Sequence, residues 1–157
     1  MKSALLIASL LTTSSAFAVD QLYLDRLMNT NICHHCNLSD ADLHGKDFTG
    51  ADMSEALLKG INLSEAKLVG AWFTRSRVHN ANFEKADLSI SLMDYALFIG
   101  ANFKGAKLDG AKLNFADLTD ADLTGATIEE TVLRGVTFCR TIMPDGKINN
   151  DGCPAEQ

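Results

Sequence analysis

Proline is almost absent from this sequence, with two residues in 157, and histidine is scarce, with four. So few prolines, beside a hydrophobic fraction of 46%, argue against a disordered chain and for one domain with a sizeable core. None of the histidines, His34, His35, His44 and His79, stands in a nucleophile or metal motif, and no glycine-rich phosphate loop occurs. We therefore expect no enzyme activity, no cofactor and no metal.

The first residues have the features of an export signal. Met1-Lys2 supplies a positive start, Ala4–Leu11 is an apolar run too short to cross a membrane, and Ala16-Phe17-Ala18 is a small-x-small cleavage site. We therefore predict a signal peptide at residues 1–18, cleaved near Ala18, rather than an ordinary N-terminal helix. The signal contains no cysteine, so we expect no membrane anchor. The predicted location is periplasmic or secreted, where disulfides form.

The sequence also lacks a run of basic residues. It has 14 Lys and Arg against 20 Asp and Glu, a net charge of −6, and the loss of Lys2 with the signal makes this −7. An acidic protein without a polybasic tract is not expected to bind nucleic acid or an anionic membrane. The partners that remain are proteins.

What the sequence has in abundance is a five-residue repeat. If i is the apolar centre of each unit, the register never slips from Cys36 to Asp145, over 110 residues or 22 units. Alanine fills position i−2 in 14 of the 22 units, and nine of the eleven glycines stand at i+2. All 22 centres are apolar: Leu38, Leu43, Phe48, Met53, Leu58, Leu63, Leu68, Phe73, Val78, Phe83, Leu88, Met93, Phe98, Phe103, Leu108, Leu113, Leu118, Leu123, Ile128, Leu133, Phe138 and Met143.

A period of five fits neither a helix nor a flat strand. On a helix at about 100° per residue, successive centres would spiral around the axis instead of forming a stripe. On a strand, an odd spacing would send successive centres to opposite faces. The backbone must therefore turn within each unit, and glycines at one fixed position fit such a bend. Repetition of this kind predicts a solenoid.

The repeat resembles a known family. Runs such as Ala41-Asp42-Leu43, Ala81-Asn82-Phe83 and Ala121-Asp122-Leu123 are similar to the A(D/N)LXX signature of pentapeptide-repeat proteins. The resemblance covers residues 36–145 and implies an all-β fold, a right-handed quadrilateral parallel β-helix with four units per coil. About five and a half coils, stacked roughly 4.8 Å apart, would form a rod about 25 Å long. The i residues would fill its centre, and the small i−2 residues would let the corners close.

Seven units depart from the small residue at i−2, and their residues are Lys46, Ile61, Ser76, Ser91, Thr131, Val136 and Thr141. Lys46 is the most awkward, because an unpaired ammonium inside the rod would be costly. We expect its amine to reach solvent or a partner carboxylate near the open end. A functional lysine is the alternative.

Both ends of a solenoid expose a core and a sheet edge, and therefore need caps. Residues 20–31 place their apolar side chains at mostly helical spacing, so we predict a short helix within an N-terminal cap at residues 19–35. At the other end, the turn signals MPDG and NNDG predict a small closing hairpin or loop, which leads into the C-terminal cap at residues 146–157.

Four cysteines allow three pairings. Cys33 and Cys36 belong to the N-terminal end of the implied rod, whereas Cys139 and Cys153 belong to the C-terminal end, and a disulfide cannot span the rod. The pairing that remains is Cys33 with Cys36 and Cys139 with Cys153. The second pair closes a loop of about 15 residues and would staple the cap.

The stretch CHHC, residues 33–36, allows other interpretations. Attachment of c-type haem requires Cys-x-x-Cys-His, but Asn37 follows. A zinc site lacks a second ligand pair, and a thioredoxin-like redox pair lacks its βαβ setting. A structural disulfide, or two buried thiols, is the interpretation we favour.

Some outward positions carry large apolar residues where the repeat otherwise places polar ones or glycine. If units four apart stack, these residues gather near one corner of the middle coils, beside arginines. We predict a partner surface made of Trp72, Arg75, Arg77, Leu92, Tyr95, Leu97, Ile99 and Phe115. It would bind a foreign protein or a second copy of the chain. The alternative is that these side chains only pack on their stacked neighbours.

These features favour a non-enzymatic, exported structural or protein-protein interaction module. A second hypothesis comes from the resemblance, because some pentapeptide-repeat proteins imitate DNA in shape and charge and protect or inhibit DNA gyrase. Export argues against it, since gyrase is cytoplasmic. The middle coils also carry Arg75, Arg77 and Lys85 instead of a continuous acidic stripe.

Overall fold

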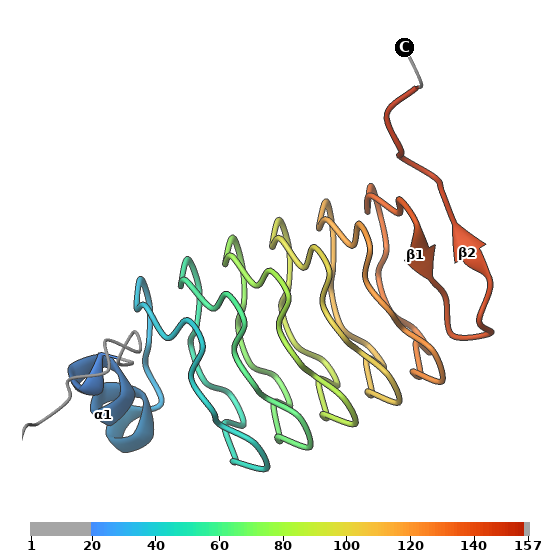
Figure 1. The fold of residues 1–157 in the computed structure, drawn as a ribbon. Coiled ribbons are helices and arrows are strands. Elements are labelled where there is room, and N and C mark those ends of the chain that lie inside the picture. Colours follow the sequence, from blue (N-terminus) through green and yellow to red (C-terminus); the bar gives the residue numbers. More distant parts are fainter. Residues whose placement is uncertain (1–19, 156–157) are drawn as a thin grey trace, which may run out of the picture.

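The five-residue repeat folds into a rod of stacked coils. The computed structural model describes residues 20–155, so the predicted signal peptide, residues 1–18, lies outside the described residues. Figure 1 shows the coils, with helix α1 (Gln21–Thr30) at one end and strands β1 (Thr141–Ile142) and β2 (Ile148–Asn149) at the other. The architecture is the right-handed quadrilateral β-helix with an N-terminal helical cap that we predicted.

A tight turn ends each unit and forms a corner of the coil. In the unit centred on Leu108, the Ala111 N–H donates to the Leu108 carbonyl at 2.9 Å, and Gly110 between them has a φ of 68°. Every i+2 residue from His35 to Arg140 likewise has a positive φ. A positive φ at the third residue of a turn is typical of type II turns and favours glycine. This requirement explains why the repeat places glycine at i+2.

Residues twenty apart lie side by side on four faces of the rod, because parallel bridges join the i−1 residues of successive coils. Face A contains Ile32, Asp52, Trp72, Leu92, Lys112 and Val132, and face B contains Asn37, Leu57, Arg77, Leu97, Asp117 and Thr137. Face C contains Asp42, Asn62, Asn82, Asn102, Asp122 and Ile142, and face D contains Asp47, Lys67, Asp87, Lys107 and Thr127. The spacing of twenty confirms four units per coil.

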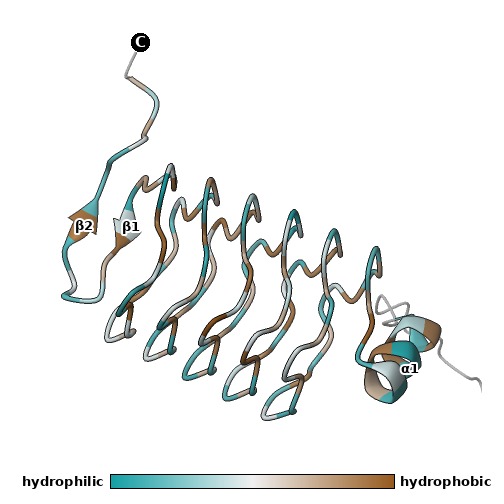
Figure 2. Cartoon of the chain, turned by 180° about the vertical axis from the view of Figure 1, so that it is seen from behind, coloured by the Kyte–Doolittle hydropathy of each residue, from teal (hydrophilic) through white to brown (hydrophobic). Residues whose placement is uncertain are grey.

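The inward side chains form one continuous core. Figure 2 shows hydrophobic and hydrophilic residues following one another along every coil. At the centre, Phe73, Phe83, Phe98 and Phe103 are fully buried, and the ring of Phe83 lies 5.8, 5.9 and 5.0 Å from those of Phe73, Phe98 and Phe103. The rings meet edge-on or stacked, which are the favourable arrangements for aromatic pairs.

Ser91 departs from this apolar interior, and its replacement by alanine is expected to stabilise the rod. Ser91 is fully buried, and its Oγ has no hydrogen-bond partner among residues 20–155. Because an unsatisfied buried hydroxyl costs about 1–3 kcal/mol, Ser91→Ala should raise the free energy of unfolding by about 1 kcal/mol in urea titrations. Ser76, at the same repeat position, donates to the Phe73 carbonyl at 2.6 Å. Ser76→Ala is therefore the control, and an equal gain in both variants would contradict the assignment.

Helix α1 covers the first coil. It begins after Asp20, whose carboxylate accepts from the Leu22 N–H at 3.0 Å, and ends at Asn31, whose N–H donates to the Leu27 carbonyl at 2.9 Å. Leu27 is buried, and Tyr23 packs against the core beside it. The helix thus shields the apolar end of the rod from water.

The repeat begins one unit earlier than we predicted. Ile32 bridges to Asp52, and Cys33 is fully buried at the centre of this extra unit. A disulfide joins Cys33 to Cys36 across its turn, where the Cys36 N–H donates to the Cys33 carbonyl at 3.1 Å. We predicted the start of the repeat at residue 36, one unit too far along the chain, because CHHC does not match the A(D/N)LXX pattern.

Lys46, the most awkward of the inward residues, is exposed. It lines a hollow with Asp47, Phe48, Thr49 and residues 27–31 at the end of α1. As expected, its side chain is in contact with solvent near the N-terminal end of the rod.

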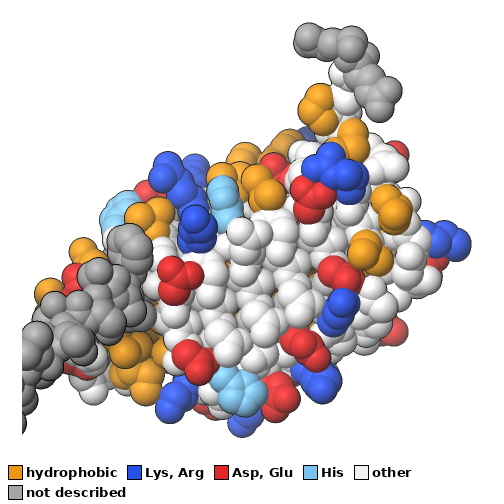
Figure 3. Space-filling view, in the orientation of Figure 1, with side chains coloured by type: hydrophobic (Ala, Val, Ile, Leu, Met, Phe, Trp, Pro, Cys, Tyr) orange, Lys and Arg blue, Asp and Glu red, His pale blue; other side chains and the backbone are white. Residues whose placement is uncertain are grey.

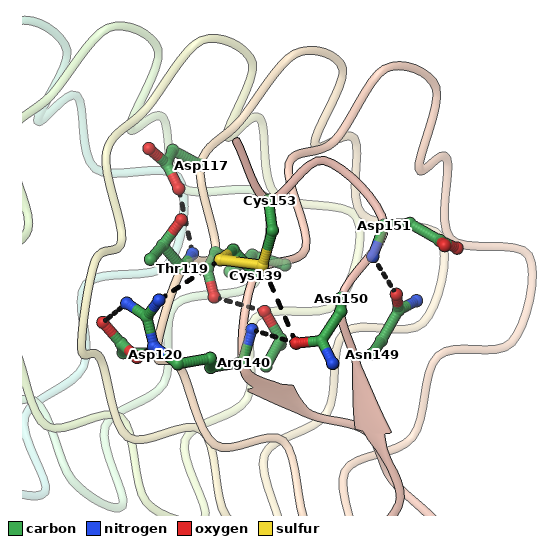
Figure 4. Close-up of a disulfide and its surroundings, with 11 residues drawn as sticks. Asp117, Thr119, Asp120, Cys139, Arg140, Asn149, Asn150, Asp151 and Cys153 are labelled. Carbon is green, nitrogen blue, oxygen red and sulfur yellow. Dashed lines mark hydrogen bonds and ion pairs between the residues drawn. A yellow bond between two sulfur atoms is a disulfide. The ribbon is translucent and has the colours of Figure 1, made fainter. Parts of the chain in front are cut away.

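A hairpin and a disulfide close the other end. Strands β1 and β2 pair antiparallel, with Thr141 opposite Asn149, and the chain then returns so that Phe138 bridges Gly152. Figure 4 shows the Cys139–Cys153 disulfide that ties this segment to the last coil. Beside it, the Arg140 guanidinium donates to both carboxylate oxygens of Asp120, at 2.6 and 2.7 Å. Both disulfides that we expected are formed.

Candidate interaction surface

Side chains stack along the corner between faces A and B. Arg75, Tyr95 and Phe115 are i+2 residues of successive coils: the Arg75 guanidinium carbon lies 5.8 Å from the Tyr95 ring centre, and the Tyr95 and Phe115 rings stack at 5.2 Å. Arg134 continues the stack, with its guanidinium carbon 5.8 Å from the Phe115 ring centre. Tyr95 is 51% exposed and Phe115 46%. We call these four residues the corner column.

Face A adds a tryptophan and neighbouring aliphatic side chains. Trp72 is 49% exposed and bridges to Leu92, which is half-buried. Ile90, at the i+2 corner that precedes face A, is 61% exposed and has a φ of 53°. A β-branched residue is rare at positive φ, because its side chain crowds the backbone. The side chain of Ile90 extends over Gly70 and Gly110, one coil away on either side, where no Cβ obstructs it.

Face B carries an arginine between leucines. Arg77 is exposed and bridges to Leu57 on one side and Leu97 on the other. Leu57 is 39% exposed, whereas Leu97 and Ile99 are half-buried. Face B thus continues the apolar surface past the corner column.

All eight predicted surface residues lie on faces A and B or on the corner between them. Trp72, Arg75, Arg77, Tyr95 and Phe115 are exposed, whereas Leu92, Leu97 and Ile99 are half-buried. Together with Leu57, Ile90 and Arg134, they form what we call the interaction surface. In Figure 3, hydrophobic side chains gather along the upper edge of the rod beside Lys, Arg and His, and much of the side facing the viewer is uncharged.

The sequence prediction missed Leu57, Ile90 and Arg134 as members of this surface. Ile90 carried a usable signal, since it stands at i+2, where the repeat prefers glycine or a polar residue. Arg134 carried none, because its contact with Phe115 joins residues 19 apart and leaves the twenty-residue register.

Within the described residues, four lysines on one side of the rod form ion pairs, whereas five cations on the other side form none. On faces C and D and their shared corner, lysines face carboxylates: Lys67–Asp47 at 3.7 Å, Lys85–Glu84 at 3.9 Å, Lys104–Asp122 at 3.0 Å and Lys107–Asp87 at 3.6 Å. On faces A and B and the corner column, five cations form no ion pair with another residue of the described chain: Lys59, Arg75, Arg77, Lys112 and Arg134.

On face D, the Asp47 carboxylate is stabilised in its charged form. Hydrogen bonds from the Thr49 hydroxyl at 2.8 Å and the Thr49 N–H at 3.1 Å lower the pKa of Asp47, and Lys67 adds to this effect. Asp47 therefore stays ionised at neutral pH, beside Lys67.

Within residues 20–155, no group of three His, Cys, Asp or Glu side chains is placed to hold a metal ion. Cys33 and Cys36 are joined to each other, so neither provides a thiolate ligand. Over the same residues, no helix has the length and apolar character needed to cross a membrane.

Comparison with known proteins agrees with this fold. Family models match the chain as pentapeptide repeats, in eight copies, over residues 32–68, 51–89 and 96–135. Among solved structures, the chain is similar to a pentapeptide repeat protein (Rfr23) from the cyanobacterium Cyanothece 51142. The two are 28% identical over 74% of this chain and 92% of that one, with a TM-score of 0.72.

Two further structures are more distant in shape. Alr5209, a pentapeptide repeat protein from Nostoc Pcc 7120, is 29% identical over 77% of this chain and 93% of that one, with a TM-score of 0.39. QnrB1, a plasmid-mediated fluoroquinolone resistance protein, is 15% identical over 77% and 87%, with a TM-score of 0.41. A search of curated proteins gave no match. The family match covers more than half of the sequence and coincides with the observed coils, so the chain belongs to the pentapeptide-repeat family.

Proposed function

We propose that this protein is a non-enzymatic, exported interaction module, in which the rod is a scaffold and the interaction surface binds a protein partner or a second copy. The observation that carries the proposal is the exposure of Trp72, Tyr95 and Phe115 on adjoining parts of one side of the rod. Tryptophan, tyrosine and arginine dominate the energetically important positions of protein interfaces.

The alternative, that these side chains only pack on their stacked neighbours, accounts for part of the surface. It fits Leu92, Leu97 and Ile99, which are half-buried. It does not fit Trp72 or Ile90, which remain 49% and 61% exposed after stacking. Export is supported by the signal-like residues 1–18 and by a fold closed with two disulfides, because such bonds persist in oxidising compartments.

The gyrase-binding alternative is not favoured. A protein that imitates DNA needs a continuous row of unneutralised negative charge. On face D, Asp47 and Asp87 instead alternate with Lys67 and Lys107, each within 4 Å of a carboxylate. Such alternation cancels the field that a duplex would present.

A pull-down tests the proposal. Mature protein is crosslinked to the periplasmic or secreted fraction, and the wild type is compared with the Trp72→Asp, Leu97→Asp variant. The variant is expected to lose the partners of the wild type, because two carboxylates are placed in the apolar surface. The control variant, His44→Asp with Val69→Asp, adds the same charges on the opposite faces and should keep the partners of the wild type. Identical partner lists for all three proteins would remove the surface from consideration.

A further inference from the structure

The cations of the interaction surface are available to a partner. Arg75 and Arg77 are exposed, and neither forms an ion pair with another residue in the described range 20–155. On faces C and D, by contrast, Lys67, Lys85 and Lys107 each lie within 4 Å of a carboxylate. On an acidic chain, cations left without a counter-charge beside exposed apolar groups indicate that the counter-charge comes from elsewhere.

The corner column presents the edges of its rings. One face of Tyr95 is covered by the Arg75 guanidinium and the other by Phe115, while Phe115 lies between Tyr95 and Arg134. The edge of an aromatic ring is the positive part of its quadrupole. Along the column, guanidinium groups and ring edges therefore offer positive charge to a partner, and the ring faces are not free for stacking.

We propose that the partner of this surface is an acidic protein segment that also carries aliphatic side chains, an inference that rests on the proposed function. Its carboxylates meet Arg75, Arg77 and Arg134, and its aliphatic groups meet Trp72 and Leu97. Arginine suits this role because its planar guanidinium binds a carboxylate through two parallel hydrogen bonds. The segment is recognised by charge and apolar contact together.

A second copy of the chain fits this surface less well. On the acidic faces of another copy, Asp47 and Asp87 already face their own lysines, Lys67 and Lys107, and these ion pairs would have to break. A uniformly anionic membrane or nucleic acid also fits poorly, because Asp52 and Asp117 stand in the same ladders as Trp72 and Arg77. A discrete pattern of acidic and aliphatic groups matches such a mixed surface better than a continuous negative one.

The experiment uses Trp72, the single tryptophan of the chain, as the reporter. Mature protein is titrated with a soluble peptide that carries two leucines flanked by glutamates. Matched peptides have lysine or serine in place of the glutamates, and vesicles containing phosphatidylglycerol form a further arm. The acidic peptide is expected to shift Trp72 emission to shorter wavelength, with an affinity that falls as salt is added.

Two charge-matched variants complete the test. Arg75→Gln with Arg77→Gln is expected to weaken binding of the acidic peptide at least about tenfold, since two charged contacts are lost. Lys67→Gln with Lys107→Gln, on face D, removes the same charge and should leave binding within about twofold, because exposed ion pairs contribute little. Circular dichroism checks that both variants keep the wild-type fold.

The proposal is overturned if no peptide changes Trp72 emission, if the lysine or serine peptide binds as tightly, or if only the vesicles bind. The pull-down described under the proposed function then tests that function separately. If the Trp72→Asp, Leu97→Asp variant loses partners, the interaction surface stands but recognises a different chemistry. If the partners are unchanged, both proposals are removed.

Discussion

Replacing Phe83 by alanine is expected to cost the rod about 3–5 kcal/mol of unfolding free energy. Phe83 is fully buried, and its ring contacts the rings of three other phenylalanines, Phe73, Phe98 and Phe103. Alanine would leave a cavity that the neighbouring coils cannot fill, because hydrogen bonds to the coils on either side fix the backbone of each coil. Urea-induced unfolding, followed by circular dichroism, measures this loss.

Phe115→Ala is the matched control for this prediction. It removes the same side chain from the corner column, where Phe115 is 46% exposed and fills no part of the core. We expect a loss below about 1 kcal/mol, as is usual for a surface aromatic contact. Equal losses in the two variants would show that the division between core and surface is wrong.

Removal of the Cys139–Cys153 disulfide is expected to destabilise the protein by about 3 kcal/mol in the chain-entropy model. The bond joins residues 14 apart and holds the returning C-terminal segment against Phe138, where Gly152 bridges to the last coil. A Cys139→Ala, Cys153→Ala variant should therefore unfold at a lower urea concentration than the oxidised wild type. The same segment should become sensitive to protease.

The N-terminal disulfide provides the comparison. Cys33 and Cys36 are only three residues apart, so the same model gives about 2 kcal/mol for their bond. The turn that they close is also held by the Cys36 N–H, which donates to the Cys33 carbonyl. A larger loss for Cys33→Ala, Cys36→Ala than for the C-terminal pair would contradict this ranking.

The repeat made most of the fold predictable. A side chain such as Leu108 or Phe103 must point inward in every unit, because five residues complete one face and its corner. The unit around Cys33 was missed for a physical reason. Cysteine fills the inward position and a disulfide closes the turn, so the unit does not need the residues of the A(D/N)LXX pattern. The predicted Cys139–Cys153 pair already indicated that the chain returns to the last coil, but the bridge between Phe138 and Gly152 was not predicted, since residues 146–157 do not follow the repeat.

The sequence predicted which side chains of the candidate surface point outward, but not how exposed each of them is. The register places Leu97 outward, yet it is half-buried because residues one coil away lie against it. The same register predicts pairs of opposite charge twenty apart, such as Lys67 with Asp47. It does not predict that Arg75 stacks on Tyr95, because the direction of a long side chain depends on what its neighbours leave open.

Site-specific photo-crosslinking in the exporting cell tests most directly whether partners bind faces A and B. A photoreactive phenylalanine analogue is placed at Leu97 on face B in one variant and at Lys67 on face D in another. We predict a discrete crosslinked adduct from position 97 and none from position 67. The adduct should disappear when Arg75→Gln and Arg77→Gln are added. Equal adducts from both positions, or an adduct from position 67 alone, would contradict an interaction surface on faces A and B.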